Sequence, residues 1–206
     1  RAQRGGIVLS AHIGNWELGG IFLRRLGLPM SVVVLPHVDA RVNRLFDLQR
    51  QRCGLTVIPL GVRATARCLE RLRQGDILGL TGDREFGQNG LEVDWFGHRV
   101  ALPRGPALLS LRTGVPVIPV FLIRKGPWRF QFYTEPPIWP PRATGSLDAV
   151  QQLSQRYANA IERIVQRFPT QWLMFQRMAP VGEAAAAAAQ PIDPETVHVS
   201  SCGRRV

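Results

Sequence analysis

The chain is poor in lysine and in cysteine, and both shortages limit what it can be. Only Lys125 among its 26 basic residues is a lysine, so the formal net charge of +11 is carried by arginine. Its three cysteines, Cys53, Cys68 and Cys202, show neither a C-x-x-C spacing nor a neighbouring histidine pattern. The sequence therefore predicts no metal site and no disulfide framework, and it indicates a reducing, cytoplasmic setting.

Long hydrophobic runs are absent as well. No apolar stretch reaches the length of about 20 residues that spans a bilayer, and no signal peptide is found. The chain has no initiating methionine and opens almost directly on an apolar strand pattern. We therefore expect that a native N-terminal segment, able to carry a membrane anchor, is missing.

The apolar content suffices for one domain. The 206 residues are 45% hydrophobic, which is enough for one core and too little to indicate two. We expect the folded domain over residues 1–180. From residue 181 onwards, alanines followed by prolines and small polar residues predict a disordered tail over residues 181–206.

Apolar runs alternate with helical patterns along the first half of the chain. The predicted strands are 7–10, 31–35, 55–60 and 76–81, and the predicted helices are 16–26, 40–52 and 64–73. Strands that are apolar throughout are typical of an α/β domain, with a mostly parallel central sheet and helices on both faces. Functional residues in such sheets lie at the carboxyl ends of the strands.

The second half predicts a hairpin and a long helix. The predicted elements are a hairpin over 91–102, a helix over 105–113, strands over 115–121 and 129–133, and an amphipathic helix over 148–168. Pro116 and Pro119 favour an edge strand or a strand entrance, because proline lacks the N–H that a ladder needs.

A histidine and a carboxylate lie where the first strand meets its helix. His12 and Glu17 would point roughly 140° apart on one continuous helix. The turn at Gly14 and Asn15 lets them meet. An imidazole held by a carboxylate is a general base at neutral pH, and the helix N-terminus beside it suits a phosphate or an oxyanion. A strand-end histidine with only a local hydrogen bond is the alternative.

Arginines gather in one third of the chain. Eight of them lie between Arg41 and Arg73, with few acidic residues among them. Such a stretch attracts polyanions, which leaves nucleic acid, anionic lipid and phosphorylated substrates open as partners.

Several short motifs follow one another in an order that is more specific than any one of them. They are His12-Ile13-Gly14-Asn15-Trp16-Glu17, Phe46-Asp47-Leu48-Gln49-Arg50, Asp83-Arg84-Glu85, Val93-Asp94-Trp95-Phe96-Gly97, Pro103-Arg104-Gly105-Pro106-Ala107, Thr113-Gly114-Val115-Pro116-Val117-Ile118-Pro119 and Pro169-Thr170-Gln171-Trp172. The series resembles the bacterial lipid A biosynthesis (late) acyltransferases and the related phosphatidylinositol mannoside acyltransferases, within the lysophospholipid acyltransferase superfamily. The resemblance runs from about Ile7 to Arg177, and Asp83-Arg84 looks more like the mannoside branch.

The resemblance implies an O-acyltransferase with a glycerolphosphate acyltransferase-like fold. His12 would be the base that deprotonates the acceptor hydroxyl, Glu17 would orient and charge it, and no covalent acyl-enzyme would form. Arg50 and Arg84 are the candidates for gripping phosphate or developing negative charge. Asp83 would complete the cleft or pair with neighbouring cations, and Gly105 would line the site with backbone amides or serve only turn geometry.

The resemblance also implies partners and a location. The expected co-substrate is a thioester of acyl carrier protein or coenzyme A, with no other cofactor. The expected acceptor is a phosphorylated glycolipid of the lipid A precursor type, at an anionic membrane surface on the cytoplasmic face of the bacterial inner membrane, and no nucleic acid is expected.

Three alternatives stay open. One is a phosphatidylinositol mannoside or lysophospholipid acyltransferase that uses acyl coenzyme A. Another is a non-catalytic domain that binds anionic lipid or RNA, although no aromatic platform is interleaved with the arginines. The third is a thiol enzyme using Cys53 or Cys68.

Overall fold

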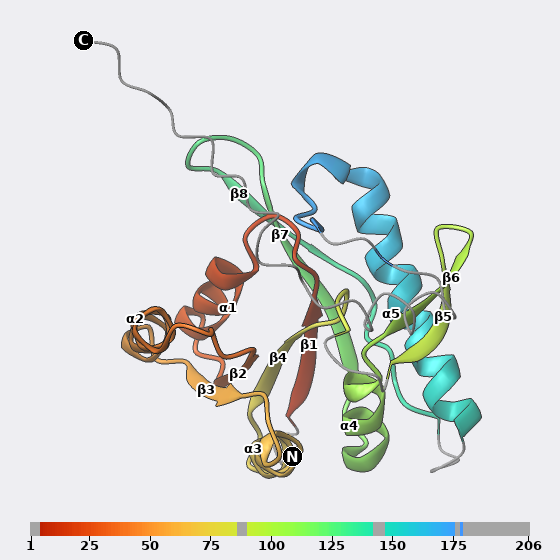
Figure 1. Ribbon diagram of the computed structural model, residues 1–206, viewed down its shortest axis with the longest axis horizontal. Helices are drawn as coiled ribbons and strands as arrows, with labels where there is room; N and C mark the ends of the chain where they lie inside the picture. The colour runs from red at the N-terminus through yellow and green to blue at the C-terminus, as the bar shows by residue number, and fades with distance from the viewer. Residues whose placement is uncertain (1–4, 86–89, 142–146, 176–177, 179–206) are drawn as a thin grey trace, which may run out of the picture.

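The computed structural model describes residues 5–85, 90–141, 147–175 and 178, and its main element is a six-stranded sheet (Figure 1). The strands stand in the order β3-β2-β4-β1-β7-β8, and the first five are parallel. Their bounds are Gly6–Ser10 (β1), Met30–Val34 (β2), Thr56–Pro59 (β3), Ile77–Thr81 (β4), Val117–Arg124 (β7) and Phe130–Thr134 (β8). The predicted α/β class with a mostly parallel central sheet is confirmed.

Five α-helices flank this sheet in the described part of the chain. They are Trp16–Arg25 (α1), Ala40–Arg52 (α2), Ala64–Arg73 (α3), Gly105–Thr113 (α4) and Leu147–Arg167 (α5), and the short 3-10 helix Pro169–Gln171 (η1) follows α5. In Figure 1 the sheet is seen nearly edge-on, with α1 and α2 on one side of it and α4 and α5 on the other. The predicted placement of helices on both faces is therefore correct.

The two faces of the sheet are distinguished by their side chains. Ile7, Leu9 and Leu78 are fully buried on the face covered by α3, α4 and α5. Val8 and Val32 lie on the opposite face and remain partly exposed. We call the first the closed face and the second the open face. The register, in which Val8 is paired with Gly79 and Val32 with Gly79, places these three residues together on the open face.

The predicted hairpin is present as the separate pair β5 (Leu91–Trp95) and β6 (His98–Leu102). Its turn is made by Phe96 at φ 49° and Gly97 at φ 77°, the left-handed pair that two-residue hairpins favour. Phe96 is held there by stacking on Trp95 at 5.9 Å and on Trp172 at 6.1 Å. The hairpin therefore packs against Trp172, which lies near the other end of the described chain.

Proline in β7 corrects one expectation. β7 lies between β1 and β8, so it is not an edge strand, while Pro116 stands at its entrance as predicted. Pro119 is tolerated inside β7 because β8 has ended beside it. There the backbone N–H of Glu135, just after β8, donates to the Pro119 carbonyl at 3.1 Å.

The predicted tail over residues 181–206, which includes Cys202, lies outside the described residues. Among the helices that are described, none has the length and apolarity needed to cross a membrane.

Candidate active site

His12 lies at the carboxyl end of the sheet, where β1 gives way to α1. Gly14, at φ 61°, makes the turn, and Asn15 caps α1 by accepting a hydrogen bond from the Leu18 N–H at 3.0 Å. A side chain at Gly14 would collide with the Leu122 carbonyl, since an added Cβ would stand 2.1 Å from its oxygen. The close approach of this turn to β7 fixes the position of the histidine.

The carboxylate that holds His12 is Asp83. Its Oδ1 lies 2.7 Å from Nδ1 of the imidazole, and its Oδ2 accepts the His12 backbone N–H at 2.9 Å. Asp83 is fully buried, whereas the side chain of His12 is 14% exposed. With Nδ1 held in this way, Nε2 is the ring nitrogen available to a substrate hydroxyl, which is the arrangement of a general base.

The sheet register explains why these two residues meet. Ser10 of β1 is paired with Thr81 of β4, and His12 and Asp83 each follow two positions later. Sequence reasoning had placed both residues at strand ends. It could not bring them together, because nothing in the sequence shows that the first and fourth strands are neighbours.

Glu17 has a different partner from the one expected. Its two carboxylate oxygens bind Arg50, at 2.5 Å to Nη2 and 3.1 Å to Nε. Because α1 begins at Trp16, it is the Trp16 ring that stands against the imidazole, edge-on at 4.9 Å. The expected contact of His12 with Glu17 is thus replaced by two separate pairs, His12 with Asp83 and Glu17 with Arg50.

Arg50 is a buried cation beside the histidine site. Its Nη1 also bonds Asp47 at 3.3 Å, and its guanidinium lies over the Phe46 ring. The hydrogen bonds that Arg50 donates to Glu17 raise the pKa of Arg50 above its ordinary value, against the opposing effect of burial. The residue therefore stays charged, and its position on α2 is fixed by three neighbours.

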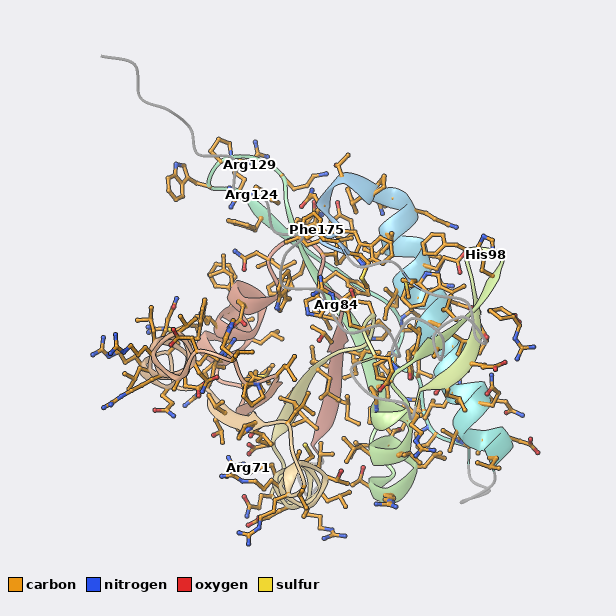
Figure 2. All side chains as sticks on the ribbon, in the orientation of Figure 1. Arg71, Arg84, His98, Arg124, Arg129 and Phe175 are labelled. Atoms are coloured by element: carbon orange, nitrogen blue, oxygen red, sulfur yellow. The ribbon has the colours of Figure 1, made fainter. Side chains whose placement is uncertain are left out.

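Arg84 directly follows Asp83 and lies near the centre of the molecule in Figure 2. Its Nη2 donates to the Leu173 carbonyl, while its Nε is buried and has no hydrogen-bond partner among the described residues. A guanidinium with one buried, unused N–H is suited to bind a negatively charged group of a ligand.

A cleft of about 1210 Å³ joins these residues. His12, Glu17, Arg50, Arg84 and Gly105 all line it, whereas Asp83 lies behind His12 and does not. Gly105 is the first residue of α4, and a side chain there would meet nothing within 4 Å, so the glycine is not required by close packing. The structure thus gathers the predicted site residues around one cavity.

The cleft continues from this polar centre into apolar space on both faces of the sheet. Its open-face walls come from β1, β2, β4, β7 and α1, and they are Val8, Val32, Gly79, Leu122, Gly20 and Leu23. A second limb runs between α3 and α4, past Cys68 and Leu109. Apolar walls around a small polar centre suit a hydrocarbon chain that carries a reactive head.

Sequence reasoning missed the segment that closes the site from behind. Trp172 Nε1 donates to Asp83 Oδ2 at 3.0 Å. The neighbouring backbone grips the histidine loop, because Gly14 N–H donates to the Gln171 carbonyl and Leu173 N–H donates to the His12 carbonyl. The motif from Pro169 to Trp172 was noticed, but its contact with Asp83 depends on the fold.

Burial argues against a thiol mechanism. Cys68 is buried on α3, and desolvation raises the pKa of its thiol to about 11. A thiol with that pKa is almost wholly protonated at neutral pH and is a poor nucleophile. Cys53 caps the C-terminus of α2 and is not among the residues that line the cleft.

Comparison with known proteins identifies relatives of this chain. The chain is 31% identical over 180 residues to the phosphatidylinositol mannoside acyltransferase of Mycolicibacterium smegmatis, a match over 85% of this chain and 57% of that protein. It is 30% identical over 180 residues to the protein of that name from Mycobacterium tuberculosis H37Rv (85% and 54%). It is 25% identical over 173 residues to the lipid A biosynthesis acyltransferase of Haemophilus influenzae (81% and 51%).

The chain therefore spans about half the length of these curated relatives. The family model of the bacterial lipid A biosynthesis acyltransferases matches residues 1–178, which is nearly the whole predicted domain. This chain belongs to the bacterial lipid A biosynthesis acyltransferase family.

Proposed function

We propose that the chain transfers a fatty acyl group from a thioester to a hydroxyl of a phosphorylated glycolipid, with His12 as general base and Asp83 as the carboxylate that orients it. The observation that carries this proposal is the 2.7 Å contact between His12 Nδ1 and the fully buried Asp83, at the edge of an apolar cleft. The buried carboxylate fixes the imidazole tautomer and stabilises the imidazolium when it forms.

The reaction balances without a covalent intermediate. His12 Nε2 takes the proton of the acceptor hydroxyl while its oxygen attacks the thioester carbonyl, and the carbonyl becomes a tetrahedral oxyanion. When this oxyanion collapses, the C–S bond breaks and the imidazolium returns the proton to the departing thiolate. Arg84, with its unused Nε–H, is suited to stabilise the oxyanion, and Gly105 remains a candidate for the same role.

Glu17 takes a supporting role in this proposal. It binds Arg50 through both oxygens, so the pair forms one wall of the cleft at the first turn of α1. We assign Arg50 to the phosphate of the acceptor or of the donor carrier, because a guanidinium fixed in place binds phosphate through paired N–H groups. Glu17 would then set the orientation of Arg50.

The acceptor class proposed here rests on the names of the relatives. The higher identity to the mannoside enzymes, 31% against 25%, favours a mannosylated phosphatidylinositol over a lipid A precursor as the first acceptor to test. The donor is a thioester of acyl carrier protein or coenzyme A. Because such donors are cytoplasmic, the proposed reaction takes place at the inner face of the cytoplasmic membrane, with the arginine-rich surface on anionic lipid.

The test compares two histidines of the same cleft. Acyl transfer by His12→Ala and by His37→Ala is followed by mass spectrometry, with both donors and both acceptors. His37 lines the cleft but stacks on Phe46 at 5.1 Å, so its loss should change the rate only a few-fold. His12→Ala should lower kcat by about 1000-fold while the melting temperature stays unchanged.

Two outcomes would reject the proposal. If His12→Ala transfers acyl chains as fast as the parent protein, general-base catalysis by this residue is wrong. If instead the parent transfers nothing and binds RNA or anionic lipid with a salt dependence that His12→Ala leaves unchanged, the chain is a polyanion-binding domain.

A further inference from the structure

Two fully exposed valines are chain neighbours of residues that line the cleft, because Val38 follows His37 and Val62 follows Gly61. Val38 is 107% exposed and Val62 is 105% exposed, in loops that follow β2 and β3. The two loops are neighbours, because the Leu60 N–H donates to the Val34 carbonyl at 2.8 Å. Leu35 and Leu60, at the bases of these loops, line the cleft and are themselves about half exposed.

Arginines surround these valines. Arg41 and Arg44 lie in the first turns of α2, just after Val38, and Arg63 directly follows Val62. Leu45, which is 65% exposed, lies on the same side of α2 as Arg41, while Arg50 is on the opposite, inward side. Side chains tipped with nitrogen extend outward from α2 at the left of Figure 2.

The acidic residues of this region are already engaged. Asp39 caps the N-terminus of α2, where its Oδ1 accepts the N–H groups of Arg41 and Val42. Asp47 bonds Arg50 and Asn43. Neither carboxylate is paired with the side chain of Arg41, Arg44 or Arg63 in any contact between described residues, so the outward charge of this surface is positive.

We propose that Val38, Val62 and Leu45, with Arg41, Arg44 and Arg63, form a docking surface that inserts into an anionic bilayer and opens the cleft directly onto the lipid. The proposal rests on the function proposed above and names where the protein meets its substrates. Apolar tips flanked by arginines match the acyl and headgroup layers of such a membrane. An amphiphilic substrate would then enter between the two loops without leaving the bilayer.

The position of this surface beside the cleft favours a membrane over a protein as its partner. A protein seated on Val38 and Val62 would cover Leu35 and Leu60 and block the cleft that substrates must use. A lipid surface leaves the cleft in contact with its substrates. The exposed apolar side chains then lie beside the path by which the substrate enters the cleft.

The experiment measures binding of the 206-residue chain to vesicles by co-sedimentation, in phosphatidylcholine alone and in phosphatidylcholine with phosphatidylglycerol. The double variant V38S/V62S should bind mixed vesicles about ten-fold more weakly, because two apolar side chains no longer insert. The double variant R41Q/R44Q should lose about five-fold per arginine and show a weaker salt dependence.

Matched variants control for surface chemistry in general. The W128S/L147S variant removes two exposed apolar side chains far from the cleft, and R73Q/R129Q removes two exposed arginines elsewhere. Both should bind vesicles as the parent does. Equal vesicle binding by V38S/V62S and the parent would overturn the proposal. A protein partner that V38S/V62S releases while vesicle binding is unchanged would also overturn it.

Failure here is distinct from failure of the proposed function. Vesicle binding needs no acyl donor, and His12→Ala should bind vesicles as tightly as the parent. Conversely, V38S/V62S should keep the parent rate on acceptor dispersed in detergent and lose rate only on vesicles. A variant that loses rate equally in both would place these valines in substrate binding and reject the docking surface.

Discussion

The closed and the open face of the sheet are covered to different degrees. On the closed face, Leu9 packs beneath α5, close to Ile161, and both side chains are fully buried. On the open face, α1 crosses the sheet with Gly19 and Gly20, and β4 presents Gly79 beneath it, so the side chains that would fill the space are missing. The fold is stabilised mainly on the closed face, while the open face carries the limb of the cleft that is bounded by β1, β2, β4, β7 and α1.

The proposed catalytic pair, His12 and Asp83, lies at the carboxyl end of the sheet, where these two faces meet. His12 reaches the cleft, while Asp83 stays buried behind it and accepts a hydrogen bond from Trp172, whose ring packs against the core. This division lets the carboxylate be held rigidly without being exposed to substrate. The comparison predicts that chemistry, stability and substrate fit can be changed separately.

The largest expected effect is on the carboxylate behind the histidine. Asp83→Asn should lower kcat by about 1000-fold, because an amide cannot stabilise the imidazolium. Glu17→Gln should lower it only about ten-fold, because Glu17 acts through Arg50. Acyl transfer rates on variants with unchanged melting temperature measure both, and equal losses would return Glu17 to the role of orienting His12.

Stability should respond to the two faces unequally. Leu9→Ala on the closed face should cost about 3 kcal/mol of unfolding free energy, because it leaves a cavity in a packed core. Val32→Ala on the open face should cost about 1 kcal/mol or less, since the side chain borders the cleft. Urea unfolding monitored by fluorescence compares the two. Equal costs would show that the open face is part of the core.

The free energy of unfolding at alkaline pH tests whether water reaches the closed face of the sheet around α3. The thiol of Cys68 ionises near its ordinary pKa in the unfolded chain and at about 11 in the fold, because burial disfavours the thiolate. The unfolded state therefore releases this proton first, and the free energy of unfolding should fall between about pH 9 and 11, by up to about 3 kcal/mol. Burial also raises the pKa of Tyr157, which acts in the same direction.

The variant Cys68→Ala separates the two groups. It keeps Tyr157, so the difference between variant and parent in unfolding free energy against pH reports the thiol alone. A parent and a variant that lose stability in parallel above pH 9 would mean that water reaches Cys68 through the cleft.

Trp172 should have a smaller effect, confined to turnover. Trp172→Phe keeps the stack on Trp95 and Phe96 and removes the Nε1–H bond to Asp83. We expect kcat to fall about ten-fold, KM to stay the same, and the pH profile of kcat to shift as Asp83 loses one donor. The exposed Trp128→Phe is the control. A change in KM alone would make Trp172 a wall of the cleft instead.

The smallest effect should come from α1. Gly20→Ala should stabilise the fold by up to about 1 kcal/mol, because alanine favours a helix and the new Cβ would stand 3.9 Å from Val32 Cγ1. The same methyl group narrows the open-face cleft, so the longest acyl donors should lose rate first. A chain-length series of donors measures this, and an unchanged series would place the acyl chain in the limb between α3 and α4.

The sequence predicted the helices and strands, but it did not predict which of them are neighbours in the fold. Apolar runs predicted the bounds of the sheet strands within two residues, except that β7 continues three residues past its predicted end, to Arg124. They succeeded because a strand buried between helices must be apolar. The partner of His12 was missed because it depends on strand order, which places β4 beside β1. The contact of Trp172 with Asp83 joins residues 89 positions apart, and no local pattern records it.

The contacts of residues 171–173 with the loop that carries His12 also have a consequence for when, during synthesis, the proposed site can be complete. Those residues supply a backbone partner to Gly14, another to His12 and a donor to Asp83, and they are synthesised after every strand and α-helix described. A nascent chain that has already folded its sheet would still lack them. We therefore expect acyl transfer to begin only after residues 171–173 have been synthesised and have packed against the loop that carries His12. A chain that stalls or ends before Leu173 would not acylate membrane lipids.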